Sequence, residues 1–181
     1  MTRFILMLLV GLTLFFTTLY MESPLVEFPA EPPGEITFTA NAGSDNLFTV
    51  NQWKFDRLEN LDNPENIAVT AVLNMKSITC DWKDLQKNLH KKKDYFYSKK
   101  FNTAQITIEG AKVQDDGSFL AEAELSLKGI TKGVPLAFTL AGEGPYELTA
   151  SVTIMRREFN FSGDGPEDEV PVMVKATLGR D

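Results

Sequence analysis

Cysteine and histidine are almost absent from this chain of 181 residues. Cys80 is the only cysteine, so no disulfide can form within the chain, and His90 is the only histidine. One residue of each kind cannot supply the four cysteine and histidine ligands of an ordinary zinc site. A catalytic triad would have only His90 as its base, and lysines surround that residue in the sequence. We therefore expect no metal, no cofactor and no enzymatic activity.

An excess of positive charge is also lacking. Lysine and arginine number 18 against 25 aspartates and glutamates, and the net charge is −7. Because nucleic-acid binding relies on a basic surface, we expect no nucleic-acid partner. The stretch 83–100 departs from this acidic average, since it holds seven lysines. Such a run can attract anionic lipid head groups, or it can simply be the solvated face of a helix.

Only one long apolar run occurs, and it lies at the N-terminus. Phe4 to Leu19 carries no charge and follows Arg3, as in the core of a signal peptide. No clean small-x-small cleavage site follows, so residues 1–21 are interpreted as a signal peptide or a retained membrane anchor. Four prolines in 22–34 indicate an extended linker. The sequence thus predicts an exported domain at 35–181, with membrane association through the N-terminus if the first segment is kept.

Helical periodicity is found in one segment, and the rest of the chain alternates like strands. Trp82, Leu85 and Leu89 share one face of a predicted helix at 82–92, with Asp81 as its expected N-cap. Elsewhere apolar and polar side chains alternate with a period of two. Eight segments show this alternation: 36–42, 47–55, 67–75, 103–110, 118–127, 135–141, 146–154 and 170–178. The second changes phase near Asn51 and Gln52, which predicts a β-bulge.

The order of these segments predicts an all-β fold. Short turns join most of the strands, which favours an eight-stranded antiparallel up-and-down β-barrel with one helix between strands 3 and 4. A sandwich of two sheets is the alternative that the same pattern permits. The fifth and sixth strands meet at a tight corner, where Gly129 and Gly133 bracket Ile-Thr-Lys. We expect these glycines to supply the positive φ that a short connection needs.

The side chains on the inward faces of the strands are almost wholly apolar, and small alanines are spread among large residues. Such a set can line a tunnel for an apolar ligand, or it can form an ordinary packed core. The tunnel-lining candidates are Phe38, Val69, Leu73, Ile106, Phe119, Ala123, Leu125, Phe138, Leu148, Val152, Val172 and Val174. Arg156 and Arg157 end a strand, where they could hold a polar head group, pair with Glu158 or cap a turn.

Four motifs occur in a characteristic order along the chain. LSLKGITKGVPLAF at 125–138 is the most specific, and MKSIT at 75–79, KDYF with FNTA in 93–104, and RREFNF at 156–161 accompany it. The first is similar to the L-T-L-x-G-V-T-K-x-V-x-L hairpin of the YceI-like polyisoprenoid-binding family, and the others resemble segments of the same family. Asn102 and Asn160 stand where that family usually has proline and glycine, so the chain is identified as a divergent member.

This resemblance implies a lipocalin-like barrel, usually exported to the periplasm, with no catalytic residues. The barrel interior would be a tunnel for a long isoprenoid chain, such as a polyprenyl or isoprenoid-quinone-like molecule, or for a similar long-chain lipid. The expected location is the periplasm or the outer face of the inner membrane. The alternative function is a structural or interaction module of the cell envelope, with a filled core and no ligand.

Overall fold

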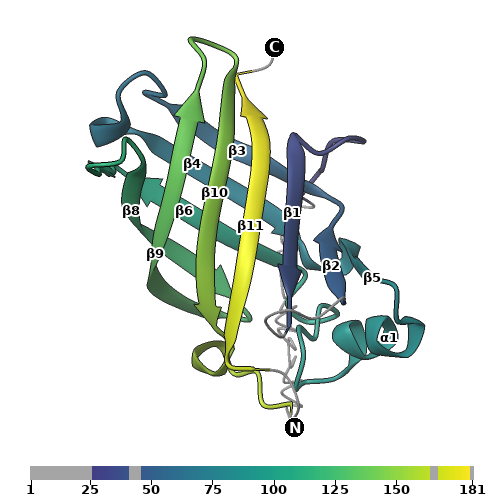
Figure 1. Cartoon of the computed structure of the whole chain (residues 1–181). Coiled ribbons are helices and arrows are strands. Elements are labelled where there is room, and N and C mark those ends of the chain that lie inside the picture. The colour runs from purple at the N-terminus through teal and green to yellow at the C-terminus, as the bar shows by residue number, and fades with distance from the viewer. Residues whose placement is uncertain (1–25, 41–45, 164–166, 180–181) are drawn as a thin grey trace, which may run out of the picture.

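Antiparallel strands form one sheet that curls round on itself, and α1 (Lys83–Lys91) lies at one end (Figure 1). The computed structural model describes residues 26–40, 46–163 and 167–179. In Figure 1, β9, β10 and β11 lie in front of β3, β4 and β6. The strands are β1 (Gly34–Thr39), β2 (Leu47–Val50), β3 (Trp53–Glu59), β4 (Ala68–Asn74), β5 (Ile78–Cys80), β6 (Thr103–Glu109), β7 (Lys112–Val113), β8 (Phe119–Leu127), β9 (Ile130–Ala141), β10 (Tyr146–Met155) and β11 (Glu169–Leu178). Short 3-10 turns are η1 (Pro64–Asn66), η2 (Met75–Ser77) and η3 (Arg156–Phe159).

The predicted class is confirmed, although eleven strands are present among the described residues instead of eight. The second predicted strand is broken at Asn51 and Gln52 into β2 and β3, and η2 divides the third into β4 and β5. The two broken strands still pair along their length, β3 with β4 and β2 with β5. The short β7 pairs only with β8 and adds the remaining strand. In place of the expected bulge, the structure has a break in each of these two strands, and the two paired strands bend at the same level.

Closure of the sheet depends on β1. It pairs with β11 along one edge, and Thr37 to Thr39 pair with β2 along the other. Beyond β2 the strands diverge, and in the described chain β3 has a strand partner only in β4. The indole Nε1 of Trp53 donates a hydrogen bond to the Gly34 carbonyl across this divergence, at 3.2 Å. A single curled sheet, and not a two-sheet sandwich, thus encloses the core.

The β8–β9 hairpin turns more tightly than predicted. Lys128 and Gly129 both have positive φ, 52° and 77°, and they are the whole connection between the strands. Two such residues match the type I′ turn, whose twist suits the flanking strands, so no longer connection is needed. Gly133 was expected at the corner but lies within β9, opposite Glu124. The prediction for Gly133 is therefore wrong.

The helix α1 is one residue shorter at each end than predicted. Its N-cap is Trp82, and no side chain caps it, so the assignment of Asp81 as the cap is wrong. His90 in the last turn forms a hydrogen bond between its Nδ1 and the Oγ of the fully buried Ser98, 2.8 Å apart. No helix within the described ranges is long and apolar enough to cross a membrane. The predicted signal or anchor segment, 1–21, lies outside the described residues.

Candidate functional site

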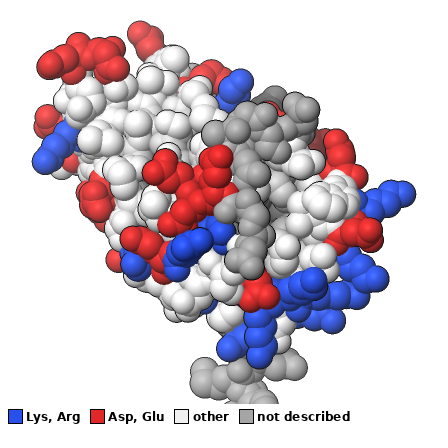
Figure 2. Space-filling view, turned by 60° about the horizontal axis from the view of Figure 1, so that its bottom comes forward, with Lys and Arg blue, Asp and Glu red and all other residues white. Residues whose placement is uncertain are grey.

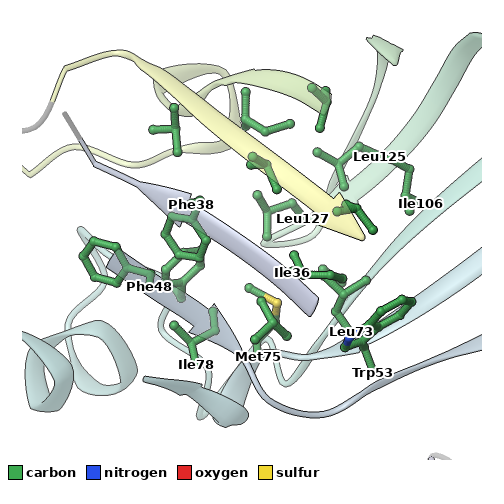
Figure 3. Close-up of a pocket in the computed structure, with 18 of the residues that line it drawn as sticks. Ile36, Phe38, Phe48, Trp53, Leu73, Met75, Ile78, Ile106, Leu125 and Leu127 are labelled. Atoms are coloured by element: carbon green, nitrogen blue, oxygen red, sulfur yellow. The ribbon is translucent and has the colours of Figure 1, made fainter. Parts of the chain in front are cut away.

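A cavity of about 580 Å³ occupies the inside of the barrel. Inward-facing residues of β1 to β6 and β8 to β11 line it, and residues of α1 cover one end. Figure 3 shows aromatic and aliphatic side chains converging on this space, from Phe38 and Phe48 near the helix to Trp53 at the far side. A pocket of this size, with this lining, is typical of a site for an apolar small molecule.

The structure places ten of the twelve tunnel-lining candidates around this cavity. They are Phe38, Val69, Leu73, Ile106, Leu125, Phe138, Leu148, Val152, Val172 and Val174. Phe119 and Ala123 do not border it. The ring of Phe119 packs against that of Phe138, with their centroids 5.3 Å apart, and Ala123 is fully buried in β8. These two candidates therefore lie in packed parts of the interior, and contact of any of the twelve with a ligand stays a prediction.

Several lining residues were missed by the candidate set. Ile36 is in phase with the candidate Phe38, and Phe48 and Val50 alternate along their own strand, so the period of two was sufficient to find them. Trp53 and Ile78 also line the cavity, but each follows the break in its strand, where the phase of the alternation changes. Leu85 and Leu89 of α1 were recognised as one apolar face, yet nothing in the sequence said that this face closes a barrel.

The cavity reaches the surface near α1. Its exposed lining residues are Asn46, Trp82, Asp84 and Asp94, and we call the opening that they border the α1 mouth. The strands agree with this position, because β1 and β10 end there while β2 and β11 begin there. Deeper in, the lining is almost entirely hydrocarbon and aromatic. The site therefore combines an apolar interior with a polar rim.

Four phenylalanine rings form a connected row behind this mouth. Phe38 stacks on Phe48 with ring centroids 4.8 Å apart, and the edge of Phe96 meets Phe38 at 5.8 Å. Phe161 meets Phe96 in the same edge-to-face manner, at 5.1 Å. Such arrangements add about 0.5–1.5 kcal/mol per pair beyond the burial of area. The row ties β1 and β2 to the two segments that follow α1 and β10.

Lys128, in the turn between β8 and β9, holds these two segments together. Its side chain is buried, and its Nζ donates hydrogen bonds to the carbonyls of Lys93, at 2.9 Å, and Asn160, at 2.5 Å. The same ammonium lies 4.2 Å from the centroid of the Phe161 ring. Burial lowers the pKa of Lys128, and the nearby carboxylate of Asp94 partly opposes that shift. The candidate set did not include this lysine.

The two arginines proposed to hold a head group occupy different places. Arg156 is buried and lines the cavity, but its Nε donates to the Glu167 carbonyl and its Nη1 to the Phe161 carbonyl, at 2.8 and 3.3 Å. Arg157 is exposed and does not line the cavity. Glu158, which was considered as their ion-pair partner, pairs with Lys132 at 3.3 Å. A head-group role remains a prediction for both arginines, and the geometry favours Arg156.

Comparisons with known proteins agree with this architecture. A curated relative, UPF0312 protein plu2095 of Photorhabdus laumondii, is 30% identical over an alignment of 115 residues, with 59% of this chain and 59% of that protein covered. The crystal structure of Burkholderia cenocepacia BcnA superimposes with a TM-score of 0.67 at 15% identity, over 80% of this chain and 94% of that one. A polyisoprenoid binding domain from Saccharophagus degradans, implicated in plant cell wall breakdown, gives a TM-score of 0.58 at 10% identity, over 81% and 92% of the two chains.

At these low sequence identities, the two structures show only that the fold is shared. The sequence itself is more specific, because residues 34–178 match the YceI-like domain. That range begins at the first residue of β1 and ends at the last residue of β11, so it covers the whole barrel. The chain belongs to the YceI-like family.

Proposed function

We propose that this protein binds a long apolar molecule, an isoprenoid or a similar lipid, inside its barrel and performs no catalysis. The observation that carries the proposal is the cavity, whose lining is apolar in depth and whose rim at the α1 mouth is polar. A chain with one polar end would match that distribution, with its hydrocarbon inside and its head group at the rim. The fold shared with a polyisoprenoid binding domain supports the same choice of ligand class.

The energetics favour a ligand that is long and purely hydrocarbon along most of its length. Each buried CH₂ group contributes about 0.8 kcal/mol, so one isoprene unit contributes on the order of 3–4 kcal/mol before the cost of ordering the chain. Two or three units would then suffice for tight binding without any polar contact. Arg156 is the candidate for a head-group contact, since it is the cationic side chain that lines the cavity within the described residues.

Mass spectrometry of organic extracts from the purified protein tests this proposal directly. We expect a long-chain apolar compound at close to one molecule per protein, together with saturable binding of an added polyprenyl alcohol to extracted protein. Absence of such a compound, combined with failure to bind the added polyprenyl alcohol, would contradict the proposal. That result would favour the alternative function, a structural or interaction module of the cell envelope.

Export is the second part of the proposal. The apolar run Phe4 to Leu19 supports delivery of the barrel to the periplasm, either free or held at the outer face of the inner membrane. Cell fractionation of the full chain and of a chain lacking residues 1–21 tests it. We expect the full chain outside the cytoplasm and the shortened chain inside it as a folded protein. Equal distribution of the two chains would refute the targeting role.

A further inference from the structure

The lysine-rich stretch forms one surface at the α1 end of the molecule. We call it the basic face; its residues are Lys83, Lys87, Lys91, Lys92, Lys93, Lys99 and Lys100. All seven are exposed, and none takes part in the four ion pairs found in the described chain. Figure 2 shows Lys and Arg side chains gathered on the side where Figure 1 places α1. The ammonium of Lys100 lies 5.0 Å from the centroid of the Phe101 ring, and the other six charges are available to a partner.

The basic face adjoins the opening of the cavity. One side of α1, with Leu85, Asn88 and Leu89, lines the cavity, while its lysines are exposed. Trp82 lies at the start of the helix on the rim of the α1 mouth, and 57% of its surface is exposed. Tryptophan is enriched at the boundary between membrane and water, because its ring is apolar and its N–H is polar. An exposed tryptophan beside lysines is thus the combination that an anionic lipid surface attracts.

We propose that the α1 end docks on an anionic lipid bilayer, with the basic face against the head groups and Trp82 in the interfacial layer. The α1 mouth would then face the lipid, so that an apolar chain could pass between bilayer and barrel without crossing water. This last consequence rests on the proposed function, whereas the docking itself does not. Each lysine near an anionic surface strengthens association about fivefold.

The charge of the rest of the molecule favours one orientation of the protein on the bilayer. The whole chain has a net charge of −7, whereas 83–100 holds seven lysines against two aspartates. The rest of the surface is therefore strongly acidic and is repelled by the same bilayer. Figure 2 shows acidic side chains over much of this face, a few of them beside the lysines. This asymmetry favours an orientation with the α1 mouth toward the lipid.

Tryptophan fluorescence of the full chain tests the proposal, because the protein contains only Trp53 and Trp82. Trp53 is 1% exposed and lies inside the barrel, away from the bilayer surface, whereas Trp82 reports transfer from water to lipid. Vesicles of phosphatidylcholine mixed with phosphatidylglycerol are compared with vesicles of phosphatidylcholine alone. We expect a blue shift of the emission only on the anionic vesicles. Trp82→Phe removes the reporter and is expected to abolish the shift.

Charge variants distinguish the effect of the basic face from the effect of the protein's net charge. The triple variant Lys87→Gln, Lys91→Gln and Lys99→Gln is expected to need about a hundredfold more anionic lipid for the half-maximal shift. The control triple variant carries Lys54→Gln, Lys112→Gln and Lys175→Gln, so it loses the same charge from β3, β7 and β11. It is expected to behave like the unmodified chain. The segment 1–25 is present in every variant, so any contribution that it makes to lipid binding is common to all of them.

Three results would overturn the docking proposal: no shift on anionic vesicles, an equal shift on neutral vesicles, or equal effects of the two triple variants. The first of these would leave an acidic protein as the partner of the basic face. Extraction of bound lipid from the same preparations tests the proposed function independently of the docking. A protein that carries an apolar ligand but does not dock refutes this inference alone, and a protein that docks but neither carries nor takes up an apolar ligand refutes the proposed function alone.

Discussion

Two groups of alanines face the inside of the barrel, and only one of them borders the cavity. Ala71, Ala104 and Ala150, on β4, β6 and β10, line it, whereas Ala121 and Ala123 on β8 do not. All five are buried, with exposed fractions between 0% and 7%. Neither the alternation along the strands nor the degree of burial separates the two groups. The difference lies in what the neighbouring strands place in front of each methyl group.

On β8 the neighbours are large. Ala121 lies opposite Leu136 of β9, and Phe119 lies opposite Phe138, and both β9 residues reach the cavity themselves. An alanine beside such side chains gives them room to pack, as close-packed interiors require. At Ala150 the space in front remains open although Phe138 is its neighbour on β9. A small inward residue therefore indicates available space, and the surrounding strands determine whether that space is filled.

The largest effect is expected from Ala150→Trp. The new ring would occupy cavity volume that we assign to the ligand, so the variant should stay folded and lose at least tenfold in affinity for an apolar chain. Extraction with mass spectrometry and titration with a fluorescent apolar probe measure this loss. Ala137→Trp, on the exposed face of the adjacent β9, is the matched control and should bind normally. Normal binding by Ala150→Trp would show that the cavity is not the ligand site.

Ala123→Trp should do the opposite. With no cavity in front of Ala123, the indole must displace packed neighbours, and overpacking costs roughly 1–3 kcal/mol or more. Urea denaturation measures the loss in the free energy of unfolding, and the fraction that stays folded should retain its ligand. If Ala123→Trp proved stable and Ala150→Trp unstable, the two groups of alanines would have to exchange roles.

Replacing Lys128, the buried lysine of the β8–β9 turn, tests whether its hydrogen bonds stabilise the packed part of the interior around β8. Lys128→Met keeps the length of the side chain but leaves the carbonyls of Lys93 and Asn160 without their ammonium donor. We expect a loss of about 1–3 kcal/mol in unfolding free energy. Lys132→Met is the control in the same hairpin, since Lys132 makes a surface ion pair with Glu158, and such pairs contribute at most about 1 kcal/mol. Equal losses for the two variants would contradict the bridging role of Lys128.

The smallest effect concerns pH. Burial lowers the pKa of Lys128 below its ordinary value, so in the window between the two values the unfolded chain holds more protons than the folded one. The contribution of Lys128 to stability should therefore rise as pH increases through that window toward about 10. Denaturation of the unmodified chain and of Lys128→Met at matched pH values isolates this contribution. A difference between them that falls with pH would have the wrong sign.

Prediction from the sequence succeeded where the signal is local. Alternation identified the barrel strands, and the spacing of Trp82, Leu85 and Leu89 identified the helix. It failed where two explanations produce the same pattern. Gly133 looks like a turn residue, but a two-residue type I′ turn at Lys128 and Gly129 makes a longer corner unnecessary.

The sequence by itself determined the class of fold, because a period of two commits each side chain to one face of a strand and an apolar face must be buried. The tertiary structure alone decided which part of the interior stays open and where it opens. It also decided that Lys128 would meet the carbonyls of Lys93 and Asn160, which lie 35 and 32 residues away in the chain. These outcomes depend on the volumes and positions of side chains from distant segments, and no local pattern encodes how those segments come together.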